Sequence, residues 1–121
     1  MSLKNYKDTK VYKKAFTLAM EIFEISKSFP KEEKYFLTDQ IRRSSRSVCA
    51  NLAEAYRKKF YPAYFISKLT DCDAVNSETT VWIDFLFQCN YINEEKHKTL
   101  VSKIEEIGKL LNYMLCHPEK Y

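Results

Sequence analysis

The residues best suited to chemistry are basic and lie in one stretch, residues 37–59. This stretch is predicted to be a helix, and its six basic residues lie outside the apolar face of that helix: Arg42, Arg43, Arg46, Arg57, Lys58 and Lys59. Within the stretch only Asp39 and Glu54 oppose them. Guanidinium and ammonium groups bind phosphate oxygens, so these six residues are candidate nucleic-acid contacts. Charged residues on a helix are also commonly just its solvated face, and that alternative stays open.

Glu94 and His97 have the one spacing in the chain that suggests a metal site. They are three residues apart, as in di-iron bundles, where both side chains leave the same helical face. Such a site needs a second motif of this kind and two further carboxylates. Glu94 lies at the start of a predicted helix, where an acidic residue is favoured by the helix dipole in any case. The single glycine, Gly108, excludes glycine-rich phosphate loops. We therefore expect no metal, no cofactor and no enzymatic activity.

Four cysteines are spread along the chain: Cys49, Cys72, Cys89 and Cys116. They form no C-x-x-C motif, and we expect each to be a buried small hydrophobic residue. A Cys–His nucleophile pair would depend on residues that meet in space, which spacing alone does not test. No signal peptide is present, and no apolar run approaches the roughly 20 residues of a membrane span. We expect a soluble cytoplasmic protein with reduced thiols.

Four stretches that could position these residues have apolar residues at helical spacings of three and four. They cover residues 10–28, about 31–59, 62–89 and 94–116. One glycine and three prolines leave few places for turns, which disfavours a β-rich chain. We therefore predict one all-α domain, residues 1–121, folded as an up-down-up-down four-helix bundle.

Two apolar features of the predicted helices concern packing. The first helix carries two neighbouring stripes: Val11, Ala15, Leu18, Ile22, Ile25 and Phe29, and beside them Tyr12, Phe16, Ala19, Phe23 and Ser26. Two stripes give the wide face of a core helix in a bundle. The end of the third helix, residues 81–89, is apolar nearly all round, and a single four-helix bundle cannot bury it completely. We therefore expect self-association.

The net charge of +4 is unevenly distributed. The start of the chain is rich in lysine, from Lys4 to Lys14, whereas residues 69–95 contain six acidic residues and no Lys or Arg. Such asymmetry fits a polyanionic partner. It fits equally an arrangement in which basic and acidic helices face each other within or between subunits.

Residues 40–55 read QIRRSSRSVCANLAEA and resemble a family signature, approximately Q-I-R-R-A-A-x-S-[VI]-P-x-N-[IL]-A-E-G. The signature is that of the four-helix bundle proteins related to the bacterial 23S rRNA intervening-sequence (S23) proteins. The flanks agree, with Asn90-Tyr91-Ile92 where the family usually has Gly-Tyr-Ile or Gly-Tyr-Leu. Cys49 replaces the usual proline, so a kink in the second helix is expected to be milder, and Ala55 replaces the usual glycine.

The resemblance implies a left-handed bundle that assembles as a homopentamer in the bacterial cytoplasm. It also implies likeness to the accessory variability protein of diversity-generating retroelements, a basic pentamer that binds nucleic acid and a reverse transcriptase. Arg42, Arg43, Asn51 and Glu54 carry over as polar signature residues, and either pairing between subunits or nucleic-acid contact would explain them. The first hypothesis is a non-enzymatic oligomer that binds RNA or DNA through a basic surface. The alternative is a protein–protein adaptor without nucleic-acid contact.

Overall fold

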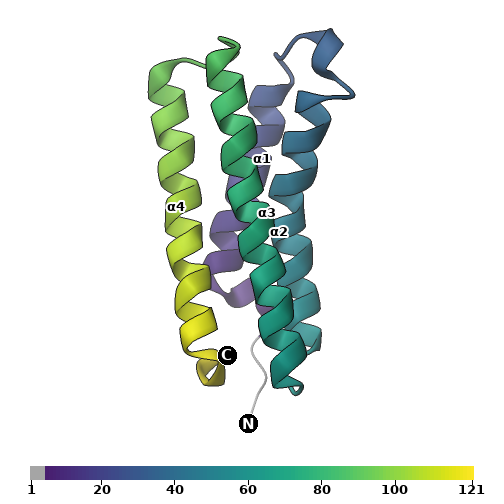
Figure 1. The fold of residues 1–121 in the computed structure, drawn as a ribbon, viewed down its shortest axis with the longest axis vertical. Coiled ribbons are helices and arrows are strands. Elements are labelled where there is room, and N and C mark those ends of the chain that lie inside the picture. Colours follow the sequence, from purple (N-terminus) through teal and green to yellow (C-terminus); the bar gives the residue numbers. More distant parts are fainter. Residues whose placement is uncertain (1–4) are drawn as a thin grey trace.

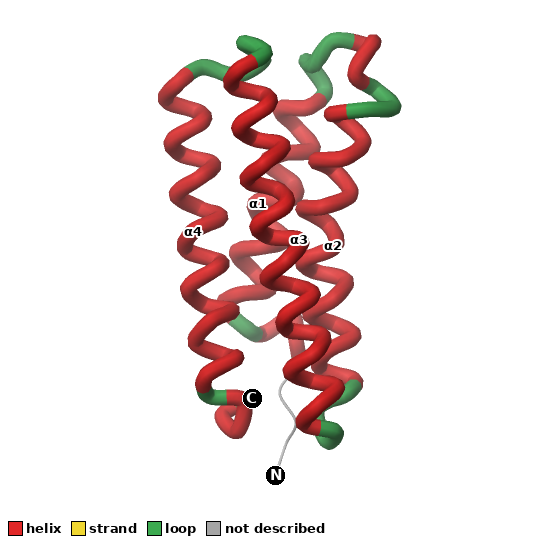
Figure 2. The backbone as a smooth tube through the Cα atoms, viewed as in Figure 1, coloured by secondary structure: helices red, strands yellow, loops and turns green. Residues whose placement is uncertain are grey.

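Four α-helices form the computed structural model, which describes residues 5–121. They are α1 (Lys10–Ser26), α2 (Leu37–Arg57), α3 (Pro62–Gln88) and α4 (Glu94–Cys116). Three short 3-10 turns accompany them: η1 (Tyr6–Asp8), η2 (Lys31–Glu33) and η3 (Pro118–Lys120). Figure 2 shows only helices and loops over the described chain, which confirms the predicted all-α class. Lys4, one of the N-terminal lysines noted in the sequence, lies outside the described residues.

The four helices run side by side along the long axis of the molecule. The α1–α2 and α3–α4 connections lie at one end, and the α2–α3 turn lies at the other with the start of α1 and the end of α4 (Figure 1). α2 contacts both α1 and α3, and α4 also contacts both of them. Each helix therefore has two neighbours, and their apolar faces meet in one interior.

Residues that favour turns delimit α3 and α4 as predicted. Pro62 occupies the first turn of α3, where its missing N–H costs nothing. Asn90 follows that helix with φ of 63°, the left-handed conformation that asparagine tolerates. Asn93 then caps α4, and its side-chain oxygen accepts a hydrogen bond from the Lys96 backbone N–H at 2.8 Å.

The second helix begins later than the sequence predicts. We expected it to start near Lys31, but η2 occupies that position and α2 begins only at Leu37. Phe36 has φ of −120° and ψ of −103°, outside the helical region, so the helix cannot extend back through it. The first helix is also shorter than expected, because Ser28 and Phe29 form 3-10-type hydrogen bonds beyond its end.

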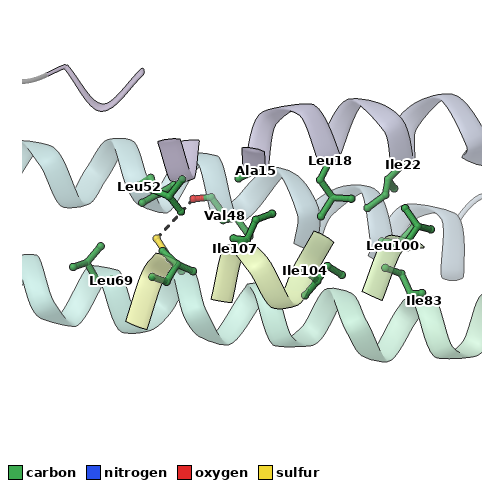
Figure 3. Packing of buried hydrophobic residues seen from close by; sticks show 14 of the residues in the cluster. Ala15, Leu18, Ile22, Val48, Leu52, Leu69, Ile83, Leu100, Ile104 and Ile107 are labelled. Atoms are coloured by element: carbon green, nitrogen blue, oxygen red, sulfur yellow. Dashed lines mark hydrogen bonds between the residues drawn. The ribbon is translucent and has the colours of Figure 1, made fainter. Parts of the chain in front are cut away.

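The core lies between all four helices and follows the predicted stripes. Figure 3 shows side chains from each helix converging: Ala15, Leu18, Ile22, Val48, Leu52, Leu69, Ile83, Leu100, Ile104 and Ile107. The first stripe of α1 is buried except for Ile25, which is half-buried. The second stripe differs from the prediction, because Phe16 is 50% exposed and Phe23 is only half-buried. One bundle can enclose one of the two stripes fully, and the other lies at its edge.

Small side chains on α2 allow α3 to approach closely. Ser44 and Ser45 are both buried, and the Thr79 hydroxyl of α3 donates to Ser44 Oγ at 2.8 Å. Cys49 lies within the unbroken run of α2. The α2–α3 contact thus combines close packing with a buried hydrogen bond.

The apolar end of α3 is incompletely buried, as the sequence predicts. Ile83 and Leu86 are fully buried in the core. Val81 and Phe85, on the other side of the same helix, are 48% and 53% exposed. The described chain therefore leaves large apolar side chains in contact with solvent.

Candidate nucleic-acid interface

The basic residues of α2 are positioned by the burial of its opposite face. Leu37, Ile41, Val48, Leu52 and Ala55 all lie in the core, with exposures of 9% or less. Because these residues recur with the period of the helix, the intervening positions must face outward. The predicted basic residues occupy those positions, and all six are exposed or half-buried.

Arg42 and Arg46 lie over the same aromatic ring of α1. The guanidinium carbons of the two arginines are 4.9 Å and 5.6 Å from the centroid of the Phe23 ring. Arg42 Nε also donates a hydrogen bond to Ser26 Oγ at 2.7 Å. Cation–π contact and this hydrogen bond hold the two guanidinium groups on the α1–α2 surface.

A third cation, Lys27, approaches the same ring from α1. Its Nζ lies 4.9 Å from the Phe23 centroid and 3.2 Å from a Glu24 carboxylate oxygen. We name the group formed by Phe23, Lys27, Arg42 and Arg46 the α1–α2 basic surface. The sequence pattern places Phe23 in the core stripe, and Lys27 is not among the six predicted residues. The signal available for Lys27 was its place four residues after Phe23, on the same face of the helix.

Several acidic residues pair with lysines of α1 and α4, away from the arginines of α2. Lys14 pairs with Glu106 at 2.7 Å and Lys103 with Glu21 at 2.5 Å, both linking α1 to α4. Among the six predicted residues only Arg43 forms an ion pair within residues 5–121, with Asp39 at 3.7 Å. Within this chain, therefore, the acidic residues of α3 do not neutralise the arginines of α2.

The other three predicted residues lie at the far end of α2. Lys58 Nζ is 5.4 Å from the Tyr64 ring centroid, and Lys59 Nζ is 4.9 Å from that of Tyr56. Arg57 is exposed in the last turn of the helix, where a cation also favours the helix dipole. Three exposed aromatic side chains accompany this basic run: Phe60, Tyr61 and Tyr64.

The structure does not bring the six residues into one cluster. Arg42 and Arg57 are 15 positions apart on one helix, which corresponds to about 22 Å at the standard rise. Arg43 follows Arg42 directly and therefore points about 100° away around the helix axis. The result is two separate basic regions, of which the one around Phe23 has the more defined geometry.

Two of the polar signature residues, Asn51 and Glu54, contact a lysine of α3. Asn51 Oδ1 accepts a hydrogen bond from Lys68 Nζ at 3.3 Å, and Glu54 pairs with the same nitrogen at 2.5 Å. Asn51 thus bonds to a side chain of α3. Lys68 therefore links α2 to α3, and neither Asn51 nor Glu54 adds to the basic surface.

The cysteines are less uniformly buried than expected. Cys72 is buried and Cys49 half-buried, and burial raises the pKa of these thiols to about 12 and about 11. Cys72 Sγ also donates to the Val48 carbonyl at 3.7 Å, the dashed contact in Figure 3. Cys89 and Cys116 are exposed, so the expectation of burial was wrong for these two, which lie at or beyond helix ends.

The Glu94 and His97 side chains of α4 make separate contacts. His97 Nε2 lies 2.8 Å from Asp84 Oδ1, and its ring stacks on Phe87 with 4.6 Å between centroids. Glu94 pairs with Lys98 at 3.2 Å. Over residues 5–121 no group of three His, Cys, Asp or Glu side chains is arranged to hold a metal ion.

None of the four helices has the combination of length and apolar composition that crossing a membrane requires. The six predicted basic residues lie on the outside of the helical bundle, in two regions along α2.

Known proteins resemble this chain in sequence and in fold. The 23S rRNA-intervening sequence protein family matches residues 7–113. A crystal structure from Bacteroides thetaiotaomicron VPI-5482, of a protein of unknown function from the S23 ribosomal protein family, superposes with a TM-score of 0.81. It is 32% identical and covers 90% of this chain and 97% of its own. No curated protein matches the sequence. The chain belongs to the 23S rRNA-intervening sequence protein family.

Proposed function

We propose that the chain is a non-enzymatic, oligomeric four-helix bundle that binds RNA or DNA through its α1–α2 basic surface. One observation carries the proposal: Arg42 and Arg46 lie together over Phe23 and have no carboxylate partner within residues 5–121. Arg46 is exposed and Arg42 half-buried, so both guanidinium groups lie at the surface, where guanidinium groups bind phosphate oxygens.

The resemblance to the S23 family and to the retroelement accessory protein supports the same proposal. It adds the left-handed up-down-up-down arrangement, a cytoplasmic location and assembly as a pentamer. The B. thetaiotaomicron protein is of unknown function. The basic surface of this chain therefore carries the functional part of the proposal.

The test is binding of a structured RNA and of a duplex DNA over a salt series. Each phosphate contact contributes about 0.9 to the slope of log affinity against log salt for a duplex. The double variant Arg42→Ala/Arg46→Ala is expected to lower the magnitude of that slope by about 1.8 and the affinity roughly thirtyfold at physiological salt. Fluorescence anisotropy measures both quantities.

A matched control removes two charges that are already paired. Lys14 and Lys98 are bound to Glu106 and Glu94, so Lys14→Ala/Lys98→Ala should weaken binding far less than the arginine variant. Absence of binding at low salt, or an equal loss in the control, would overturn the proposal. A pull-down that yields one stoichiometric protein and no nucleic acid would favour the adaptor alternative.

Self-association is the second part of the proposal, and exposed apolar side chains support it. Val81 and Phe85 on α3 and Phe16 and Met20 on α1 are each between 45% and 53% exposed. A charge placed among them should prevent association, because it would have to be buried without a partner. We expect the wild-type chain to sediment at five times its 14.4 kDa mass and Phe85→Lys to sediment as a monomer.

The control for this experiment is Phe60→Lys, which changes an exposed aromatic residue in the α2–α3 turn. It should leave the oligomer intact. A wild-type chain that sediments as a monomer at micromolar concentration would refute the association, whatever the variants do.

A further inference from the structure

A pocket of about 300 Å³ lies where the end of α1, the η2 turn and the start of α2 meet. Its lining includes four cationic side chains: Lys27, Lys31, Lys34 and Arg42. No acidic residue lines it. Such a concentration of positive charge in a concave site favours a multiply charged anion.

Of the acidic residues nearest along the chain, two pair with residues outside the pocket and one with a lysine of its lining. Glu24 pairs with Lys27 at 3.2 Å, and Asp39 pairs with Arg43. Glu33 accepts a hydrogen bond from the Tyr91 hydroxyl at 2.9 Å, which raises the pKa of that hydroxyl to about 12. Glu24 thus compensates Lys27, and Glu32 forms no ion pair within residues 5–121. Lys31, Lys34 and Arg42 have no carboxylate partner in that part of the chain.

Thr38 places a buried, unused hydroxyl in the lining of this pocket. Its side chain is only 6% exposed, and its Oγ1 has no hydrogen-bond partner. A buried hydroxyl without a partner lowers the stability of the fold, so a hydroxyl kept at such a position points to a ligand that completes it.

The N-terminus of α2 adds further donors at the same place. Phe36 precedes the helix, and no side chain caps it. The backbone N–H groups of residues 37–39 make no hydrogen bond to the preceding turn within the described chain. They lie at the positive end of a 21-residue helix, where an anion is favoured.

We propose that this pocket binds a phosphomonoester. The Thr38 hydroxyl and the N-terminal N–H groups of α2 donate hydrogen bonds to the phosphate oxygens, and Arg42 and the lysines pair with the phosphate charge. A monoester carries about two negative charges at neutral pH, against one for a diester within a strand. It also has only one substituent, so it can enter far enough to meet a hydroxyl that is 6% exposed. Both points favour a terminal phosphate over an internal one.

Two sources share this chemistry: the phosphorylated end of a nucleic-acid strand, and a small phosphate. The first deepens the proposed function and rests on it, whereas the second is independent of it. The probes are inorganic phosphate and two RNA strands of one sequence, one ending in a 5′-phosphate and the other in a 5′-hydroxyl. Calorimetry gives the affinities, and amide chemical shifts of residues 37–39 report where inorganic phosphate binds.

The informative variant is Thr38→Val, which keeps the shape of the side chain and removes the hydroxyl. We expect it to bind inorganic phosphate about tenfold more weakly, since it loses one charge-assisted hydrogen bond. It should melt at the same temperature as the wild type or higher, because the hydroxyl has no internal partner. A purely structural role for the hydroxyl would instead lower the melting temperature and leave phosphate binding unchanged.

Lys34→Ala provides a second variant that does not threaten the fold, because Lys34 is exposed. It should also weaken phosphate binding, whereas the control Lys98→Ala on α4 should not. No binding of inorganic phosphate at low salt, or unchanged binding in both Thr38→Val and Lys34→Ala, overturns the site.

The RNA strands separate the two proposals. Tighter binding of the 5′-phosphorylated strand, lost in Thr38→Val, assigns the pocket to strand ends. If phosphate binds but neither strand does, the proposed function fails and the pocket stands as a site for a small phosphate. If both strands bind equally and phosphate does not compete, nucleic-acid binding stands and the pocket proposal fails.

Discussion

The hydrogen bond between Ser44 of α2 and Thr79 of α3 allows a quantitative test of the packing that positions the arginines. The two oxygens are 2.8 Å apart, and Thr79 Oγ1 also lies 2.9 Å from the Val75 carbonyl. Ser44 Oγ accepts from Thr79, and its own hydroxyl donates only to the Ile41 carbonyl at 3.4 Å. One hydroxyl hydrogen serves one acceptor at a time, so the two positions respond differently to mutation.

Thr79→Val leaves Ser44 Oγ buried with only that long contact, and we expect it to cost about 1–2 kcal/mol of unfolding free energy. Ser44→Ala leaves the Thr79 hydroxyl its bond to Val75. Alanine also gains about 0.5 kcal/mol in helix propensity, so this variant should lie within about 0.5 kcal/mol of the wild type. In the double variant no hydroxyl lacks a partner, and its cost should be about 0.5–1 kcal/mol below the sum of the single costs.

Urea denaturation of the four proteins at one protomer concentration measures these differences, since the stability of an oligomer depends on concentration. A loss of about 1 kcal/mol corresponds to a fall in melting temperature of roughly 3–6 °C for a chain of this length. Two results would show that the buried hydroxyl pair does not stabilise the α2–α3 contact. One is a change in unfolding free energy of less than about 0.3 kcal/mol for Thr79→Val, and the other is a double variant whose loss equals the sum of the two single losses.

Three further predictions follow from local geometry. Gly108→Ala should stabilise the fold by about 0.5–1 kcal/mol in thermal melts, because the added Cβ meets its nearest neighbour at an ordinary 3.6 Å and the helix gains propensity. Burial would raise the pKa of Glu21, but the hydrogen bond and charge of Lys103 lower it below 4.5. The charged carboxylate therefore stabilises the fold, and the wild type should be more stable than Glu21→Gln above pH 4.5. This stability difference should shrink as the pH falls through the lowered pKa. Cys89 should react with a thiol reagent within the folded protein, whereas Cys72, buried and with a pKa of about 12, should react only on unfolding, as timed mass spectrometry would show.

The helical elements could be predicted because their causes are local. A stripe of apolar residues with helical period determines which face is buried, and Pro62, Asn90 and Asn93 determine where helices begin and end through their own backbone preferences. The start of α2 could not be predicted in the same way. Residues 31–36 include good helix formers, and the interruption comes from the backbone of Phe36, which depends on how the turn packs on the bundle.

The candidate site was predictable only in part because it lies between two helices. The sequence shows that Arg42 and Arg46 share one face of α2, four positions apart. It does not show that Phe23 of α1 lies beneath them, since an aromatic residue in an apolar stripe is normally assigned to the core. Thr38 gave no signal either, because the absence of a partner for its hydroxyl is a property of the folded chain.

Arg42 connects the two proposed sites. Its Nε donates to Ser26, its guanidinium carbon lies 4.9 Å from the Phe23 ring centroid, and its side chain also lines the pocket of Thr38. A strand whose terminal phosphate occupied that pocket would therefore meet Arg42 first and could then pass Arg46, which lies one helical turn further along α2. Because Arg42 also ties α1 to α2, its replacement combines a loss of binding with a loss of stability. Arg46 has no hydrogen bond or ion pair within the described chain, so its replacement separates the two effects.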